Sequence, residues 1–187
     1  MRAFFAKTTA LLAKNGQTPQ FWYEGNAGIY HPGETVYAWR QDQALQSIEK
    51  TKKAGLNLIM ASNEYCYLDF PQIQGQRNWG WMKTTTLQKC YELDPAFGKP
   101  EKEAGHIRGV HAPVWAERLP DLDHLLYRAY PRACAIAEAG WSPMSVRSWE
   151  NFRRKLADHR QFILKRFNYD MKRTQGNEPA FRWENNK

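Results

Sequence analysis

The sequence of 187 residues is poor in cysteine and contains no long hydrophobic run. Its three cysteines, Cys66, Cys90 and Cys134, form neither a CxxC pair nor a Cys/His cluster, which argues against a disulfide framework and a zinc site. No stretch approaches the roughly 20 apolar residues that a membrane-spanning helix needs. We therefore expect buried thiols, no metal, no cofactor and no membrane partner.

Positive charge is in excess, at +8, but it is not concentrated in one place. The densest stretch, residues 147–173, alternates basic with apolar residues, as an amphipathic helix with a solvated basic face does. A nucleic-acid-binding domain remains an alternative, but it predicts clustered basic residues among exposed aromatics. Because the charges are spread along the chain, we expect no nucleic-acid partner.

The first residues predict a helix of the fold rather than a leader. Phe4, Phe5, Leu11 and Leu12 make a helical stripe, and Lys7 interrupts the apolar run that a signal peptide would need. We expect the chain to begin inside a fold, and its compartment stays unknown.

Aromatic residues are abundant, at 14% of the chain, and eight of them are tryptophans. With a hydrophobic fraction of 42%, the chain has enough apolar material to fill the core of one domain. Two uses of the tryptophans remain open. They can pack the core, or their flat faces can bind the C–H face of a sugar ring.

Predicted strands and helices alternate along the chain. We expect four strands, at residues 19–23, 34–39, 56–60 and 107–115, with helical segments between and after them and a long loop at 61–83. Alternation of this kind predicts an α/β fold with parallel strands, and four strands make half of an eight-stranded β/α barrel. We assign residues 1–170 to this partial barrel and 171–187 to a loose polar tail.

Aromatic and acidic residues gather where the predicted strands end, which is where a β/α barrel carries its functional groups. Trp22 and Trp39 close the first two strands. Tyr67 and Asp69 lie in the loop after the third, and Glu117 lies just beyond Trp115 at the end of the fourth. These strand ends are the predicted functional site.

The same strand ends resemble family-20 glycoside hydrolases, the β-N-acetylhexosaminidases. Residues 32–40 are similar to the family's sixth barrel strand, the Tyr67-Leu68-Asp69 signature to its seventh, and Trp115-Ala116-Glu117 to its eighth. Residues 131–142 resemble the helix that follows. The resemblance covers about residues 3–167 and implies the C-terminal half of the catalytic barrel, strands 5–8 with their helices.

The resemblance implies a retaining, substrate-assisted hydrolysis that removes terminal N-acetylhexosamine from glycans or chito-oligosaccharides. The acetamide oxygen of the substrate attacks its own anomeric carbon, a Glu protonates the leaving oxygen, and a neighbouring Asp orients the acetamide. Trp22, Trp39 and Trp115 would wall the acetamide slot, with Trp115 also under the sugar ring. The Tyr67 hydroxyl would donate to the acetamide oxygen.

The resemblance also implies polar contacts with the sugar. Asp69 and Glu117 would accept hydrogen bonds from its hydroxyls, and Trp81 matches a further pocket tryptophan, with Trp79 as the alternative. Four of these site residues also have an ordinary structural explanation. Trp22 and Trp39 can be barrel core, Asp69 can cap a turn, and Glu117 can pair with a neighbouring arginine.

The family's Asp-Glu pair is absent, since no Asp-Glu dipeptide occurs in the sequence. The chain would supply the sugar pocket without the general acid, so we expect it to be inactive alone. Its expected partners are an N-acetylhexosamine-terminated glycan and a missing N-terminal half-barrel, or a second copy joined through the open sheet. A carbohydrate-binding remnant without catalysis is the alternative. Family members are commonly exported, periplasmic or lysosomal, and no leader is expected in this chain.

Overall fold

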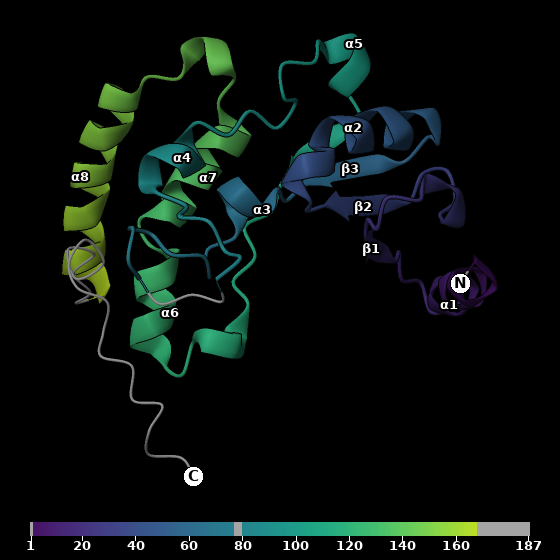
Figure 1. Cartoon of the computed structure of the whole chain (residues 1–187), viewed down its shortest axis with the longest axis horizontal. Helices are drawn as coiled ribbons and strands as arrows, with labels where there is room; N and C mark the ends of the chain where they lie inside the picture. Colours follow the sequence, from purple (N-terminus) through teal and green to yellow (C-terminus); the bar gives the residue numbers. More distant parts are fainter. Residues whose placement is uncertain (1, 77–79, 168–187) are drawn as a thin grey trace. The chain divides into compact units, whose positions relative to one another are not determined.

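A computed structural model of the chain describes residues 2–76 and 80–167, in two compact units (Figure 1). Of the described residues, the first unit contains 2–66 and 94–111. The second contains 67–76, 80–93 and 112–167. The polar tail predicted at 171–187 and the alternative pocket residue Trp79 lie outside the described residues, and the single domain expected over 1–170 stays a prediction.

The first unit is built on a sheet of four parallel strands, which confirms the predicted α/β class. The strands are β1 (Gln20–Trp22), β2 (Thr35–Ala38), β3 (Asn57–Met60) and β4 (Ile107–Val110), and they neighbour one another in chain order. Trp22 lies opposite Tyr37, and Tyr37 lies opposite Ile59. Helix α2 (Ala44–Lys53) connects β2 to β3, as a parallel pair requires.

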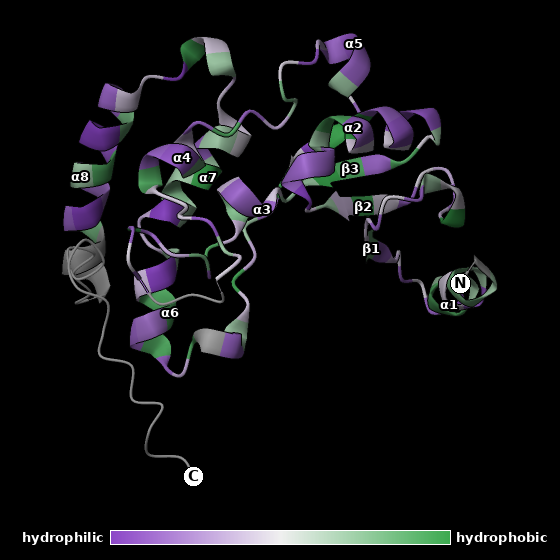
Figure 2. Cartoon of the chain, viewed as in Figure 1, coloured by the Kyte–Doolittle hydropathy of each residue, from purple (hydrophilic) through white to green (hydrophobic). Residues whose placement is uncertain are grey.

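One face of this sheet carries the core of the first unit. Val36, Leu58 and Met60 are fully buried there with Ile48 of α2. Figure 2 shows the contrast between hydrophilic residues along α2 and the hydrophobic strand β3 beside it. Helix α1 (Arg2–Lys14) adds Phe5, whose ring lies 5.0 Å from that of Phe21.

Two segments of the first unit differ from the sequence prediction. The fourth strand ends at Val110 instead of residue 115, because its last backbone bond to β3 is the one that the N–H of His111 donates to the carbonyl of Met60, at 2.9 Å. The loop predicted at 61–83 begins with a short helix, α3 (Asn63–Cys66). The remaining helix of this unit is α5 (Glu101–Ala104), directly before β4.

The second unit is helical. Its helices are α4 (Leu87–Tyr91), α6 (Leu122–Ala129), α7 (Arg132–Trp141) and α8 (Trp149–Phe167), and α7 packs against the other three. Asp121 caps α6 by accepting a hydrogen bond from the backbone N–H of His124. Over residues 2–76 and 80–167, no helix is long and apolar enough to cross a membrane.

A fully buried arginine holds the second unit together. Nη1 of Arg132 donates to the carbonyl oxygens of Phe70 at 3.0 Å and Thr85 at 2.9 Å, while Nη2 donates to those of Leu68 and Arg128. Burial lowers the pKa of Arg132 to about 10, which still leaves it charged at neutral pH. One guanidinium on α7 therefore fixes the segment that carries Tyr67 and Asp69.

We expect Arg132→Met to lower the free energy of unfolding by about 3–5 kcal/mol, because four buried carbonyls would lose their donor. Arg132→Lys should be nearly as damaging, since an ammonium cannot reproduce the planar fork. Urea unfolding followed by circular dichroism measures both. Arg153→Met, on the exposed side of α8, is the control and should change stability by less than about 0.5 kcal/mol. Equal stability of the Arg132 and Arg153 variants would contradict the anchoring role.

Candidate functional site

An aromatic cluster surrounds the predicted pocket residues of the second unit. The ring of Tyr67 lies 6.2 Å from that of Trp115 and 5.5 Å from that of Phe70, and Phe70 lies 5.5 Å from Trp81. Tyr67 is buried, whereas Trp81 and Trp115 are 62% and 39% exposed. The two indoles therefore present apolar surface that a ligand can reach.

Asp69 is buried beside this cluster, with 7% of its surface exposed. Its Oδ1 atom has no hydrogen-bond partner among the described residues. Burial raises the pKa of Asp69 to about 6, against the opposing effects of its own and Trp115's backbone N–H groups and of Arg132, while Glu117 raises it further. A buried carboxylate oxygen without a donor is costly, and a ligand hydroxyl would satisfy it.

The local backbone explains why these residues meet. The N–H of Leu68 donates to the carbonyl of Pro113 at 2.9 Å, which joins the Tyr67–Asp69 segment to the segment leading to Trp115. Glu117 follows in a short 3-10 helix, η3 (Ala116–Arg118), and is exposed. The structure thus brings Tyr67, Asp69, Trp81, Trp115 and Glu117 into one region of the second unit.

The other two predicted residues lie in the first unit, at the ends of neighbouring strands. Trp22 is half-buried and its ring lies 5.5 Å from Tyr37 and 6.0 Å from His111. Nε1 of Trp39 donates to Oε1 of Glu24 at 3.2 Å. Neither indole is among the fully buried side chains of this unit, so both keep surface for other contacts. Their convergence with Tyr67 and Trp115 stays a prediction.

The sequence analysis did not identify three residues that contact or support the candidate site. They are Glu24, His111 and Arg132. Glu24 lies beyond the end of β1, where strand alternation no longer applies, so no local pattern indicated its contact with Trp39. His111 gave no signal of its contacts with the Trp22 and Tyr37 rings. Arg132 lies in a motif that was noted only for its resemblance.

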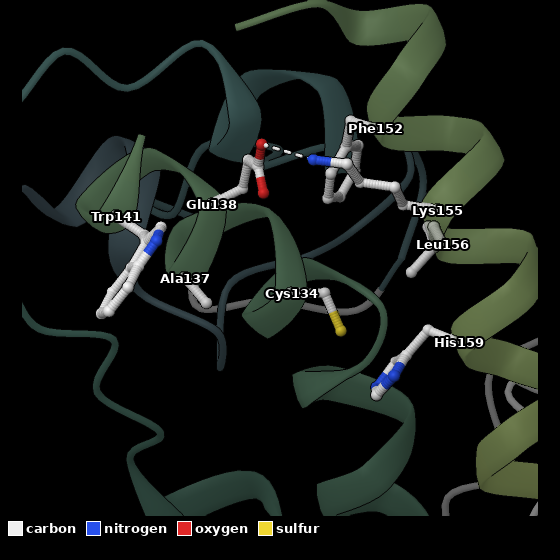
Figure 3. A pocket seen from close by; sticks show the side chains of 8 residues that line it. All are labelled: Cys134, Ala137, Glu138, Trp141, Phe152, Lys155, Leu156 and His159. Carbon is white, nitrogen blue, oxygen red and sulfur yellow. Dashed lines mark ion pairs between the residues drawn. The ribbon is translucent and has the colours of Figure 1, made fainter. Parts of the chain in front are cut away.

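A separate groove of about 410 Å³ lies between α7 and α8 (Figure 3). An ion pair between Glu138 and Lys155, at 3.6 Å, crosses it, and Trp141 lies at its edge with 89% of its surface exposed. It is lined by Cys134, Ala137, Glu138, Trp141, Phe152, Lys155, Leu156 and His159, none of which is a predicted pocket residue. Within the described residues, no group of three or more His, Cys, Asp or Glu side chains could hold a metal ion.

Two known proteins resemble the chain over most or all of its length. A β-hexosaminidase of Akkermansia muciniphila is 96% identical over all 187 residues, which make up 38% of that protein. A β-N-acetylhexosaminidase of Cellulomonas fimi is 28% identical over 75% of the chain and 29% of its own length. The chain therefore spans less than two-fifths of the length of either relative.

Solved structures agree with these relatives. A crystal structure of a β-N-acetylhexosaminidase matches 98% of the chain and 39% of its own, with a TM-score of 0.93 and 96% identity. A Streptomyces plicatus β-hexosaminidase variant in complex with its product GlcNAc matches 87% of the chain and 34% of its own, with a TM-score of 0.73 and 31% identity. The family described as glycosyl hydrolase family 20, catalytic domain, matches residues 1–144. The chain therefore belongs to glycosyl hydrolase family 20 and is part of that family's catalytic domain.

Proposed function

We propose that the chain is the C-terminal half of the catalytic barrel of a retaining, substrate-assisted β-N-acetylhexosaminidase. The order of its motifs supports this placement, since they resemble the sixth, seventh and eighth strands in turn. The four parallel strands in chain order fit one half of an eight-stranded barrel. In this proposal the remaining part of the longer protein supplies the first four strands.

The observation that carries the proposal is the buried Asp69 carboxylate with an unpartnered oxygen beside an aromatic cluster. A pyranose has apolar C–H faces for the Trp81 and Trp115 indoles and hydroxyls that donate to a carboxylate. Since an unpaired buried carboxylate is unfavourable, a ligand without the matching hydroxyl binds poorly. The site therefore has the chemistry of a sugar pocket.

The acetamide group of the substrate takes the aromatic side of this pocket. Trp22, Trp39 and Trp115 wall an apolar slot for its methyl group, while the Tyr67 hydroxyl donates to its oxygen. Held in this way, the acetamide oxygen lies close to the anomeric carbon of the same sugar. It therefore acts as the nucleophile in place of an enzyme carboxylate. The Tyr67 hydrogen bond also stabilises the oxazoline-like intermediate as charge develops on that oxygen.

The substrate class is a glycan or chito-oligosaccharide that ends in N-acetylhexosamine. Support comes from the Streptomyces plicatus relative, which was solved with GlcNAc bound. Glu117 accepts further hydrogen bonds from the sugar hydroxyls, and the general acid comes from the part of the protein outside this chain.

We also propose that the other half of the barrel covers two surfaces that this chain leaves exposed. The second face of the sheet, where Tyr37 and Gln20 meet through a hydrogen bond, lacks the buried cluster of the first. On the second unit, Trp141, Met144 and Val146 are exposed apolar side chains. In this proposal the rest of the protein or a second copy covers these exposed apolar side chains.

The pH dependence of sugar binding tests the role of Asp69. The test protein, called the full-length hybrid below, is the Akkermansia muciniphila relative with its matching 187 residues replaced by this sequence. As pH rises through about 6, Asp69 ionises and becomes a better acceptor, so calorimetry should show GlcNAc affinity rising and then levelling. Asp69→Asn should weaken binding by about tenfold above pH 6 and remove this rise. An unchanged pH profile in Asp69→Asn would overturn the assignment.

Ionisation of Asp69 should also change thermal stability, which should fall with rising pH whereas GlcNAc affinity rises. Because the folded state raises the pKa of Asp69, it binds more protons than the unfolded state between about pH 4 and 6, so stability falls as pH rises through that window. Without ligand, Asp69→Asn should therefore melt at a higher temperature than the unsubstituted hybrid above pH 6, and this advantage should vanish near pH 4. Asp123→Asn, at an exposed position on α6, is the control and should show no such divergence.

The isolated chain should show negligible turnover of an aryl N-acetylglucosaminide, because in this proposal the general acid lies in the part of the protein outside the chain. A general acid contributes about 10²–10⁴-fold, so the full-length hybrid should exceed the chain by at least this factor. Both are measured by release of the aryl group. Turnover by the chain near that of the hybrid would show that a residue within it, such as Glu24 or Glu64, supplies the acid.

A further inference from the structure

The indole of Trp39 is held at its polar edge by a carboxylate from the segment that follows β1. Nε1 of Trp39 donates to Oε1 of Glu24 at 3.2 Å. The last paired residues of β1 and β2 are Trp22 and Tyr37, so Glu24 and Trp39 each lie two residues beyond the paired part of the sheet. The N–H of Tyr23 still donates to the carbonyl of Tyr37, at 2.9 Å, which keeps the two segments together up to this point.

A cation lies near the face of the same ring. The guanidinium carbon of Arg40 is 5.7 Å from the ring centroid of Trp39, within the range of a cation–π contact. Arg40 is itself paired with Asp42, at 3.5 Å. The backbone is fixed as well, since the carbonyl of Trp39 accepts from the N–H of Asn63 at 2.8 Å. Edge, face and backbone of Trp39 each have a partner, which restricts the rotation of the indole.

We infer that Glu24 is a positioning residue for hydrolysis, acting through Trp39. This inference rests on the proposed function, in which Trp39 walls the slot for the substrate's acetamide. The acetamide oxygen must lie within attack distance of the anomeric carbon, and misplacement by about 1 Å can lower the rate about 10²-fold. By fixing the orientation of the Trp39 indole, Glu24 fixes one wall of the slot that holds the acetamide in position for attack.

The position of Glu24 separates this role from a role in folding. Glu24 is exposed, and hydrogen bonds at exposed positions contribute little to stability. Its loss should therefore leave the fold intact while freeing the indole. Glu24→Gln keeps an oxygen that accepts from Nε1, whereas Glu24→Ala removes the acceptor.

The test compares four variants of the full-length hybrid: Glu24→Ala, Glu24→Gln, Trp39→Phe and Glu49→Ala. Glu49 is an exposed carboxylate of the same unit that pairs with Lys99 at 3.0 Å, so its variant controls for the loss of a surface charge. Readouts are kcat and KM on an aryl N-acetylglucosaminide, the melting temperature, and the indole N–H resonance of ¹⁵N-labelled Trp39, which is assigned by its absence from Trp39→Phe.

We expect Glu24→Ala to lower kcat about tenfold with KM changed less than about threefold, because substrate still binds but is poorly aimed. Its Trp39 resonance should move upfield and its melting temperature should stay within about 2 °C of the unsubstituted hybrid. Glu24→Gln should retain most of kcat, and Glu49→Ala should match the unsubstituted hybrid.

Two further outcomes are distinguishable. If Trp39→Phe lowers kcat while Glu24→Ala changes neither kcat nor the Trp39 resonance, the positioning role is overturned and the pocket assignment stands. If Trp39→Phe leaves hydrolysis unchanged, Trp39 is not in the pocket, and the assignment on which the inference rests is overturned.

Discussion

The buried guanidinium of Arg132 is the interaction on which the second unit depends. It donates to four backbone carbonyls, three of which lie 47 to 64 residues away along the chain. The three distant acceptors, on Leu68, Phe70 and Thr85, belong to irregular parts of the chain that have no sheet or helix to satisfy them. A single charged side chain therefore supplies the hydrogen bonds that a neighbouring strand would supply in a sheet. These bonds fix the position of the segment that carries Tyr67 and Asp69.

Placing the arginine on α7 gives this arrangement its rigidity. The helix packs against α4, α6 and α8, and its residues Ala135, Ile136 and Ala139 are buried. Small side chains on that face let the neighbouring helices approach closely. The anchor is thus attached to the best-packed helix of its unit, while the segment that it holds keeps surface for a ligand.

The sequence predicts the local features of the fold well and its long-range polar contacts poorly. Alternation of strand and helix signals predicts the four parallel strands, and the structure confirms them. The family can be recognised because its motifs are short and contiguous. The partners of Arg132 and the contact of Glu24 with Trp39 depend on register and on distant carbonyls, which no local pattern encodes. The pocket that would combine residues of both units stays a prediction for the same reason.

The order of the strands has a consequence for how the sheet forms. Each strand pairs with the strand completed just before it, and no strand is inserted between two earlier ones. During synthesis the sheet can therefore lengthen one strand at a time as the polypeptide leaves the ribosome. The slowest closure should be the last, since Leu58 pairs with Ile107 across a much longer stretch of chain than separates Thr35 from Asn57. Until β4 docks, the edge of β3 is the part of the nascent protein most open to mispairing.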